Sequence, residues 1–202
     1  MELLWPEDDP GKTVKRLHVA LASLRRTLEP DIRRGTPSAY IIRSGDAYRI
    51  AIGNGGRVDI EGFIDELKFA REEKDPEKAI EHYLNAASTY RGDFLEEDLY
   101  TPWCEEERER FRGEYLQLLE GLIEFYDDKK DYKKCIVYAK KYLTVDKYAE
   151  DVYQVLMTYY SRIGNKAMVS RTFNKCKDLI TAELDCPLSE ETEDLYQRLV
   201  SR

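Results

Sequence analysis

The sequence predicts a mainly α-helical chain in which one helix and a β-hairpin precede an array of paired helices. Three observations predict this class. Apolar residues recur at helical spacing along most of the 202 residues, a short alternating segment interrupts them near the start, and a 34-residue repeat lies in the second half. The glycine-rich stretch 53–56 separates the two regions, so we expect domains at 1–53 and 57–202.

The first predicted element is an amphipathic helix over residues 12–28. Its apolar positions form one stripe, and Pro30 ends the helix. The stripe consists of Val14, Leu17, Leu21, Leu24 and Leu28. With this stripe facing inward, Arg25 lies at its border and a second set of side chains lies on the outer faces. The outer set is Lys15, Arg16, Val19, Ala22, Ser23 and Arg26.

A β-hairpin is predicted over residues 38–51. Ile41 and Tyr48 stand among alternating residues, and the segment 44–46, Ser-Gly-Asp, supplies the turn. Arg43 lies beside this turn.

Seven further helices are predicted after the glycine-rich stretch. Asp75 and Pro76 begin one of them, Gly164 ends another, and Ser189 caps the last. Their expected ranges are 59–73, 76–90, 102–128, 131–144, 149–163, 165–182 and 189–201.

A loop is predicted over residues 91–102, between two of these helices. Four apolar side chains are expected to hold it against them: Phe94, Leu95, Leu99 and Tyr100. The charged run 105–110 that follows is interpreted as a solvated helix face with pairs such as Glu106 and Arg110.

The internal repeat indicates the architecture of the helical region. Tyr126 and Tyr160 lie 34 residues apart, which is the tetratricopeptide period. The same shift pairs Leu122 with Leu156, Asp131 with Asn165, Cys135 with Val169, and Ala139 with Phe173. Stacked helix pairs offer a concave surface for other proteins, and tyrosines are suited to lining it. The alternative, which we favour, places four of the tyrosines in the core: Tyr126, Tyr138, Tyr159 and Tyr160.

Charge is unevenly distributed along the chain, whose formal net charge is -8. Between residues 12 and 52, nine Lys and Arg stand against three Asp and Glu, whereas residues 53–202 hold 23 Lys and Arg against 33 Asp and Glu. Because phosphate binding is electrostatic, this distribution indicates that a polyanion contacts the N-terminal region only. The alternative is two solvated faces with a chance bias in charge.

The basic helix has the residue types that DNA recognition requires. Lys12, Lys15, Arg16, Arg25 and Arg26 are suited to phosphates or guanine edges. Val19 with the small Ala22 and Ser23 allows close approach to base edges, and an arginine beside a hairpin turn, here Arg43, can enter a minor groove. The alternative is an ordinary amphipathic helix with a solvated basic face.

Other function classes find little support in the sequence. His18 and His82 have no nucleophile or metal-ligand partner at a motif spacing, and the four cysteines form no CxxC pair. We therefore expect no enzyme activity, no cofactor and no metal. Neither a signal peptide nor a transmembrane run is recognisable, so a cytoplasmic protein without membrane contact is expected.

Six segments together resemble one family, the bacterial transcriptional activator domain proteins, which include the antibiotic regulatory (SARP-type) regulators. The resemblance extends over essentially the whole chain. The segments are Leu-Trp-Pro at 4–6, Leu-His-Val-Ala-Leu-Ala-Ser-Leu-Arg-Arg-Thr-Leu-Glu-Pro at 17–30, Gly-Asp-Ala-Tyr-Arg at 45–49, Val-Asp-Ile-Glu-Gly-Phe at 58–63, Tyr-Arg-Gly-Asp-Phe-Leu at 90–95 and Trp-Cys-Glu-Glu-Glu-Arg-Glu-Arg at 103–110.

The resemblance implies an OmpR-type winged helix before a tetratricopeptide-like activator domain. It implies a regulator that binds double-stranded promoter DNA and recruits RNA polymerase or another regulatory protein, in a family with links to phosphorelay signalling. The resemblance leaves open whether the protein forms a homodimer. The family's recognition helix falls on 12–28 and its wing on 38–51, with Arg43 as the wing arginine. Positions that face bases or backbone fall on Lys15, Arg16, Val19, Ala22, Ser23 and Arg25.

Two departures from the family pattern stand out. The chain starts inside the second helix of the winged helix, so the domain is expected to be truncated, with Leu17, Leu21 and Leu24 lacking the residues they normally pack against. The family's Glu-Leu-Gly-x-x-Pro is shortened at 183–187 to Glu-Leu-Asp-Cys-Pro. Two functions follow. The first is a DNA-binding activator, and the alternative is a protein-interaction module whose truncated winged helix does not bind DNA.

Overall fold

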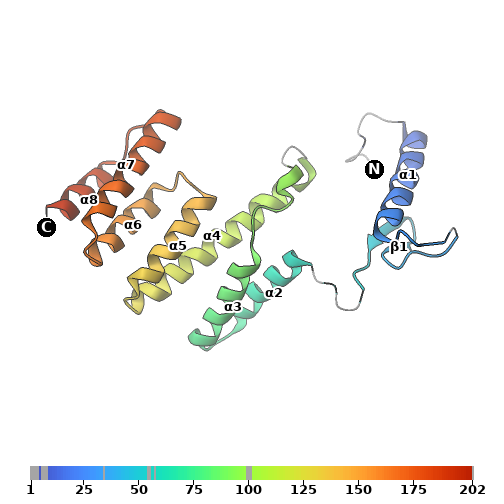
Figure 1. Ribbon diagram of the computed structural model, residues 1–202, viewed down its shortest axis with the longest axis horizontal. Helices are drawn as coiled ribbons and strands as arrows, with labels where there is room; N and C mark the ends of the chain where they lie inside the picture. The colour runs from blue at the N-terminus through green and yellow to red at the C-terminus, as the bar shows by residue number, and fades with distance from the viewer. Residues whose placement is uncertain are drawn as a thin grey trace. The chain divides into compact units, whose positions relative to one another are not determined.

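The computed structural model describes Trp5 and residues 9–33, 35–53, 56, 58–98 and 102–201. The chain divides into two compact units, residues 1–61 and 62–202 (Figure 1). Part of the glycine-rich stretch lies outside the described residues. The expected domain boundaries, at 1–53 and 57–202, stay a prediction.

The first unit consists of a helix and a two-stranded antiparallel hairpin. Helix α1 spans Pro10–Leu28, and strands β1 and β2 span Ile41–Ser44 and Ala47–Ile50. Ser44 pairs with Ala47, so the turn is narrower than predicted and Ser44 belongs to the strand. Gly45 opens the turn with a φ of 62°, a conformation that glycine adopts without strain.

The second unit is an array of helices that follow one another in chain order (Figure 1). Each helix from α3 onward packs on the next, and α8 also packs on α6. A 3-10 turn at Pro102–Cys104 precedes α4, which therefore begins three residues later than predicted. The helices are α2 Asp59–Glu72, α3 Pro76–Thr89, α4 Glu105–Asp128, α5 Tyr132–Val145, α6 Glu150–Arg162, α7 Lys166–Glu183 and α8 Glu190–Val200. The mainly helical class is confirmed.

The 34-residue repeat is visible in the core of the array. Leu122 and Leu156 are both buried, as are the other apolar positions that the repeat pairs. The two polar positions act alike as helix caps. The side chain of Asp131 accepts a hydrogen bond from the Lys134 backbone N–H, and that of Asn165 accepts one from the Met168 N–H. Of the four tyrosines assigned to the core, Tyr138 is half-buried and the other three are buried.

The loop before α4 is held differently from the sequence-based expectation. Phe94 contacts the Phe111 ring, with 5.5 Å between centroids, but Leu95 is 42% exposed. Leu99 and Tyr100 lie outside the described residues. The interpretation of 105–110 as fully solvated is wrong, because Arg108 is buried and donates to the Phe94 carbonyl at 2.9 Å.

The ion pair predicted in this run also differs. The partner of Arg110 is Glu107, one helical turn away, rather than Glu106. Across the described residues, no helix is long and apolar enough to cross a membrane. Within the same residues, no group of three or more His, Cys, Asp or Glu side chains is placed to hold a metal ion.

Candidate nucleic-acid interface

Helix α1 positions the basic side chains of the first unit. It starts where the carboxylate of Asp9 accepts a hydrogen bond from the Gly11 N–H at 2.8 Å, with Pro10 in the first helical turn. Arg25 and Arg26 occupy its last turn, where cations interact favourably with the helix dipole. The helix therefore presents cations up to its C-terminus.

The structure places most of the predicted contact residues on the surface of α1. Val19 is 70% exposed although its side chain is apolar. Ala22 and Arg25 are half-buried, and the exposed members of the set are Lys12, Lys15, Arg16, Val19, Ser23 and Arg26. Because these positions recur every three or four residues, they form a ridge along the helix with small or apolar side chains between the cations.

The expectation that the apolar stripe of α1 faces inward is met only in part. Leu17 and Leu21 are half-buried, whereas Val14, Leu24 and Leu28 are each about two-fifths exposed, at 40%, 38% and 41%. The stripe thus remains largely in contact with solvent in this unit.

A hydrogen-bond network joins the end of α1 to the start of the hairpin. The carboxylate of Glu29, which follows the helix, accepts hydrogen bonds from the Ser38 hydroxyl and from the Ala39 N–H, the latter at 3.0 Å. The Ser38 hydroxyl oxygen in turn accepts from the Ile41 N–H at 2.9 Å. The bond from Ser38, followed by that from Ala39, lowers the pKa of Glu29. The network ties the hairpin to α1.

Arg43 is exposed but folded over its own turn. Its Nε donates to the Gly45 carbonyl at 2.9 Å, and its Nη2 lies 3.7 Å from a carboxylate oxygen of Asp46. Both side chains are mostly exposed, so this contact is weak and exchanges readily with another anion. The guanidinium therefore stands at the hairpin tip, where it is accessible to a ligand.

A cationic hollow lies between the last turns of α1, the loop after it and β1. Its volume is about 1090 Å³, and four arginines line it: Arg25, Arg26, Arg33 and Arg43. The Nε of Arg25 is buried and has no hydrogen-bond partner among the described residues. The structure thus brings three of the predicted cations together with Arg33, a residue that sequence reasoning missed. Its position shortly after the helix-ending proline, next to a second arginine, was the available signal.

Comparison with known proteins identifies the family. Residues 58–200 match the family model described as the bacterial transcriptional activator domain. The chain belongs to this family. A comparison with curated proteins gives no match.

A solved structure extends the likeness to the first unit. The fold is similar to that in "Mycobacterium tuberculosis EmbR in complex with low affinity phosphopeptide", with a TM-score of 0.62 over 99% of this chain at 18% sequence identity. The chain spans about half, 53%, of that structure's length. The arrangement of a helix and hairpin before a helical array is therefore shared with EmbR.

Proposed function

We propose that the chain is a DNA-binding transcriptional activator of the SARP type, which reads promoter DNA with helix 12–28 and wing 38–51. The observation that supports this most is the concentration of arginines around one hollow between α1 and the hairpin, in a chain whose family is one of transcriptional activators. A ridge of exposed cations continues from this hollow along α1.

Each predicted residue has a role in this proposal. Lys12, Lys15 and Arg16 neutralise phosphates beside the major groove, while Val19, Ala22 and Ser23 contact base edges. Arg25 and Arg26 contact phosphates at the C-terminal end of α1. Arg43 exchanges its contact with Asp46 for the minor groove.

The helical array supplies protein contacts in this proposal. Stacked helix pairs present a continuous surface to partners, and RNA polymerase is the partner that the family resemblance implies. EmbR is in complex with a low-affinity phosphopeptide in its structure, but about half of that protein has no counterpart in this chain. We therefore assign no phosphopeptide site here.

The alternative function is a protein-interaction module whose first unit does not bind DNA. Two observations favour it. Leu24 and Leu28 remain exposed on α1, and the Arg43 guanidinium already has an anionic neighbour. An exposed apolar stripe is typical of a surface that packs against another protein.

DNA selection followed by affinity measurement tests the proposal. The full chain is used to enrich duplexes from a random-sequence pool, and its affinity for an enriched duplex is measured by fluorescence anisotropy. We expect the double variant Arg16→Ala, Arg25→Ala to bind at least about tenfold more weakly, because two phosphate or base contacts are lost.

The matched control removes two exposed arginines of the array, Arg110→Ala and Arg198→Ala, and is expected to bind as tightly as the unmodified chain. If no duplex is enriched, or if the first double variant keeps full affinity, the proposal is wrong and the interaction module is favoured.

A further inference from the structure

Helices α5 and α7 carry a second set of exposed cations, in the acidic part of the chain. Helix α5 contains four lysines and no acidic residue, and α7 contains four cations against two acidic residues. Both helices bury their apolar sides and pack on α6. All eight cations are exposed: Lys133, Lys134, Lys140, Lys141, Lys166, Arg171, Lys175 and Lys177. We call this set the α5–α7 face.

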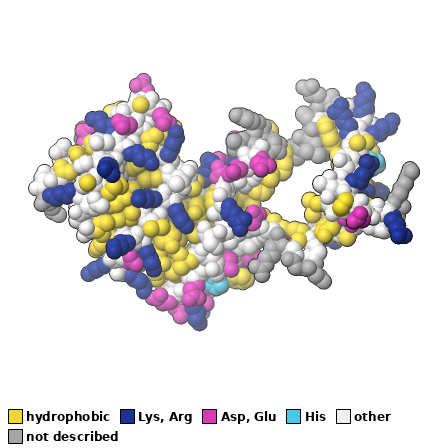
Figure 2. All heavy atoms as spheres, viewed as in Figure 1, with side chains coloured by type: hydrophobic (Ala, Val, Ile, Leu, Met, Phe, Trp, Pro, Cys, Tyr) yellow, Lys and Arg dark blue, Asp and Glu magenta, His cyan; other side chains and the backbone are white. Residues whose placement is uncertain are grey.

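Figure 2 shows dark blue lysine and arginine side chains spread over the part of the array that contains these helices. Within the part of the chain that the structure describes, one of the eight cations has a carboxylate partner, since Lys134 lies 3.9 Å from Asp131. Lys140 and Lys141 instead lie over the rings of Tyr160 and Tyr138. The charge of this face is therefore largely uncompensated.

Elsewhere in the array, cations pair with carboxylates of neighbouring elements. Arg162 of α6 contacts Asp127 of α4 at 2.6 Å. The same holds for Arg71 with Glu114, Arg112 with Asp93, Lys129 with Glu77 and Lys147 with Glu183. Five cations elsewhere in the array are thus held by carboxylates of neighbouring elements, whereas among the described residues seven of the eight cations of the α5–α7 face have no carboxylate partner.

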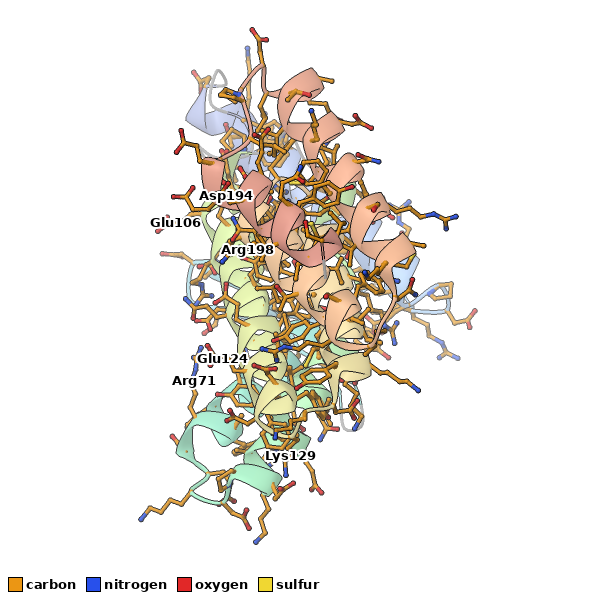
Figure 3. All side chains as sticks on the ribbon, turned by 90° about the vertical axis from the view of Figure 1, so that its left-hand side faces the viewer. Arg71, Glu106, Glu124, Lys129, Asp194 and Arg198 are labelled. Carbon is orange, nitrogen blue, oxygen red and sulfur yellow. The ribbon has the colours of Figure 1, made fainter. Side chains whose placement is uncertain are left out.

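Acidic residues gather on other helices of the same array. Helix α4 contains nine acidic residues against three arginines, and α8 contains four against one. In Figure 3 the labelled side chains Glu106 and Glu124 of α4 and Asp194 of α8 lie on the same side of the array as the labelled Arg71 and Arg198. Acidic residues therefore outnumber cations on α4 and α8, whereas cations outnumber acidic residues on α5 and α7.

The composition of this face favours a phosphate backbone over a protein partner. Lysines dominate it, and lysine is depleted from protein interfaces, whose centres are apolar or aromatic. Both helices are described throughout, and Val137 is the one large apolar side chain exposed on them. Mobile point charges on helical ridges suit the repeating phosphates of a nucleic acid.

We propose that the α5–α7 face binds the phosphate backbone of duplex DNA without reading its bases. This inference rests on the proposed function, because it assumes that the chain binds a duplex. It extends DNA contact to the helical array, which the charge of the chain as a whole, -8, does not lead one to expect.

The salt dependence of DNA binding tests this proposal in the full chain. Affinity for the enriched duplex, extended by flanking sequence, is measured over a range of salt concentrations for the triple variant Lys133→Gln, Lys140→Gln, Arg171→Gln. Each phosphate contact adds about 0.9 to the slope of log affinity against log salt, so we expect the slope to fall by about 2 to 3. The matched control Lys133→Arg, Lys140→Arg, Arg171→Lys keeps the charges and is expected to keep the slope.

The outcomes separate this inference from the proposed function. If the α1 variant loses affinity while the triple variant keeps both affinity and slope, the α5–α7 face does not bind DNA, and the proposed function stands. If the triple variant changes only the sedimentation of the free protein, the occupant is the acidic helices α4 and α8 of a second copy, and the inference is wrong. If the unmodified chain binds no duplex, both proposals fail.

Discussion

At the scale of single residues, a partly buried ion pair holds the segment after α3. Arg112 of α4 contacts the carboxylate of Asp93, which also accepts a hydrogen bond from the Tyr90 hydroxyl at 2.8 Å. The Tyr90 ring stacks on Tyr115, with 3.9 Å between centroids. Burial acts to raise the pKa of Asp93, but the bonds from Arg112 and Tyr90 outweigh it, and the pKa lies below its ordinary value of 3.8.

Because the pKa of Asp93 is lowered, the contribution of this ion pair to the stability of the fold depends on pH. Because the pKa is lowered in the folded state, the ionised Asp93 stabilises the fold above about pH 4, and this contribution is lost as pH falls through the folded-state pKa. We expect Asp93→Asn to lower the free energy of unfolding by about 2 kcal/mol near neutral pH, and by less as the pH falls below about 4.

Urea unfolding of both proteins across this pH range checks the prediction. The control Asp128→Asn, at an exposed position, is expected to change stability by less than about 0.5 kcal/mol. A destabilisation by Asp93→Asn that grows as the solution is acidified would contradict this account.

Arg108 shows where sequence reasoning at the residue scale fell short. Its side chain donates to the Phe94 and Leu95 carbonyls, so it fixes the loop that apolar side chains were expected to hold. Glutamates and arginines surround it in the sequence, and such a charged run favours the interpretation that its side chain is solvated. However, Arg108 lies on the same helical stripe as the buried Cys104, Phe111 and Tyr115, and this spacing was the signal.

At the scale of elements, the repeat extends to the turns between paired helices. After α4, the Asp131 N–H donates to the Tyr126 carbonyl at 2.9 Å, and after α6 the Asn165 N–H donates to the Tyr160 carbonyl at 2.8 Å. The residue before each donor adopts a positive φ, 58° at Lys130 and 76° at Gly164. The two turns are the same Schellman motif, with glycine in one copy only.

Because of this difference, substitutions at the two positions are expected to change the free energy of unfolding in opposite directions. Lys130→Gly is expected to raise the free energy of unfolding by about 1 kcal/mol, because a lysine with a positive φ is strained, and Gly164→Ala is expected to lower it by about 1 kcal/mol. No atom lies within 4 Å of a Cβ built at Gly164, so the expected cost comes from the backbone alone.

Thermal or urea unfolding measures both changes. Gly121→Ala is the matched control, because Gly121 lies inside α4 and also has open space around its Cβ position. Alanine at this position is expected to raise the free energy of unfolding by up to about 1 kcal/mol. Equal effects of alanine at positions 121 and 164 would contradict the role assigned to φ.

The helices themselves were well predicted from the sequence. Apolar spacing, Pro76 after Asp75, and Ser189 as a cap place most helix ends within one or two residues of the observed ones. These signals are local, so they need no knowledge of the rest of the fold. The start of α4 was missed because Pro102 begins a 3-10 turn rather than the helix itself.

At the scale of the whole molecule, charge distribution distinguishes the two units. The sequence indicates the basic first unit directly, because its cations are close together in the chain. The hollow lined by arginines was not predicted, since it requires the loop and β1 to turn back toward the end of α1. The α5–α7 face was missed for a related reason: the net charge of residues 53–202 conceals how cations and carboxylates separate onto different helices.

The central claim is that α1 and the hairpin contact duplex DNA, and an arginine-modification footprint tests it most directly. The full chain is treated with phenylglyoxal with and without the enriched duplex, and the modified sites are quantified by mass spectrometry. We expect the duplex to protect Arg25, Arg26 and Arg43 and to leave Arg198 of α8 reactive. Unchanged reactivity of the three arginines at saturating duplex would contradict the claim.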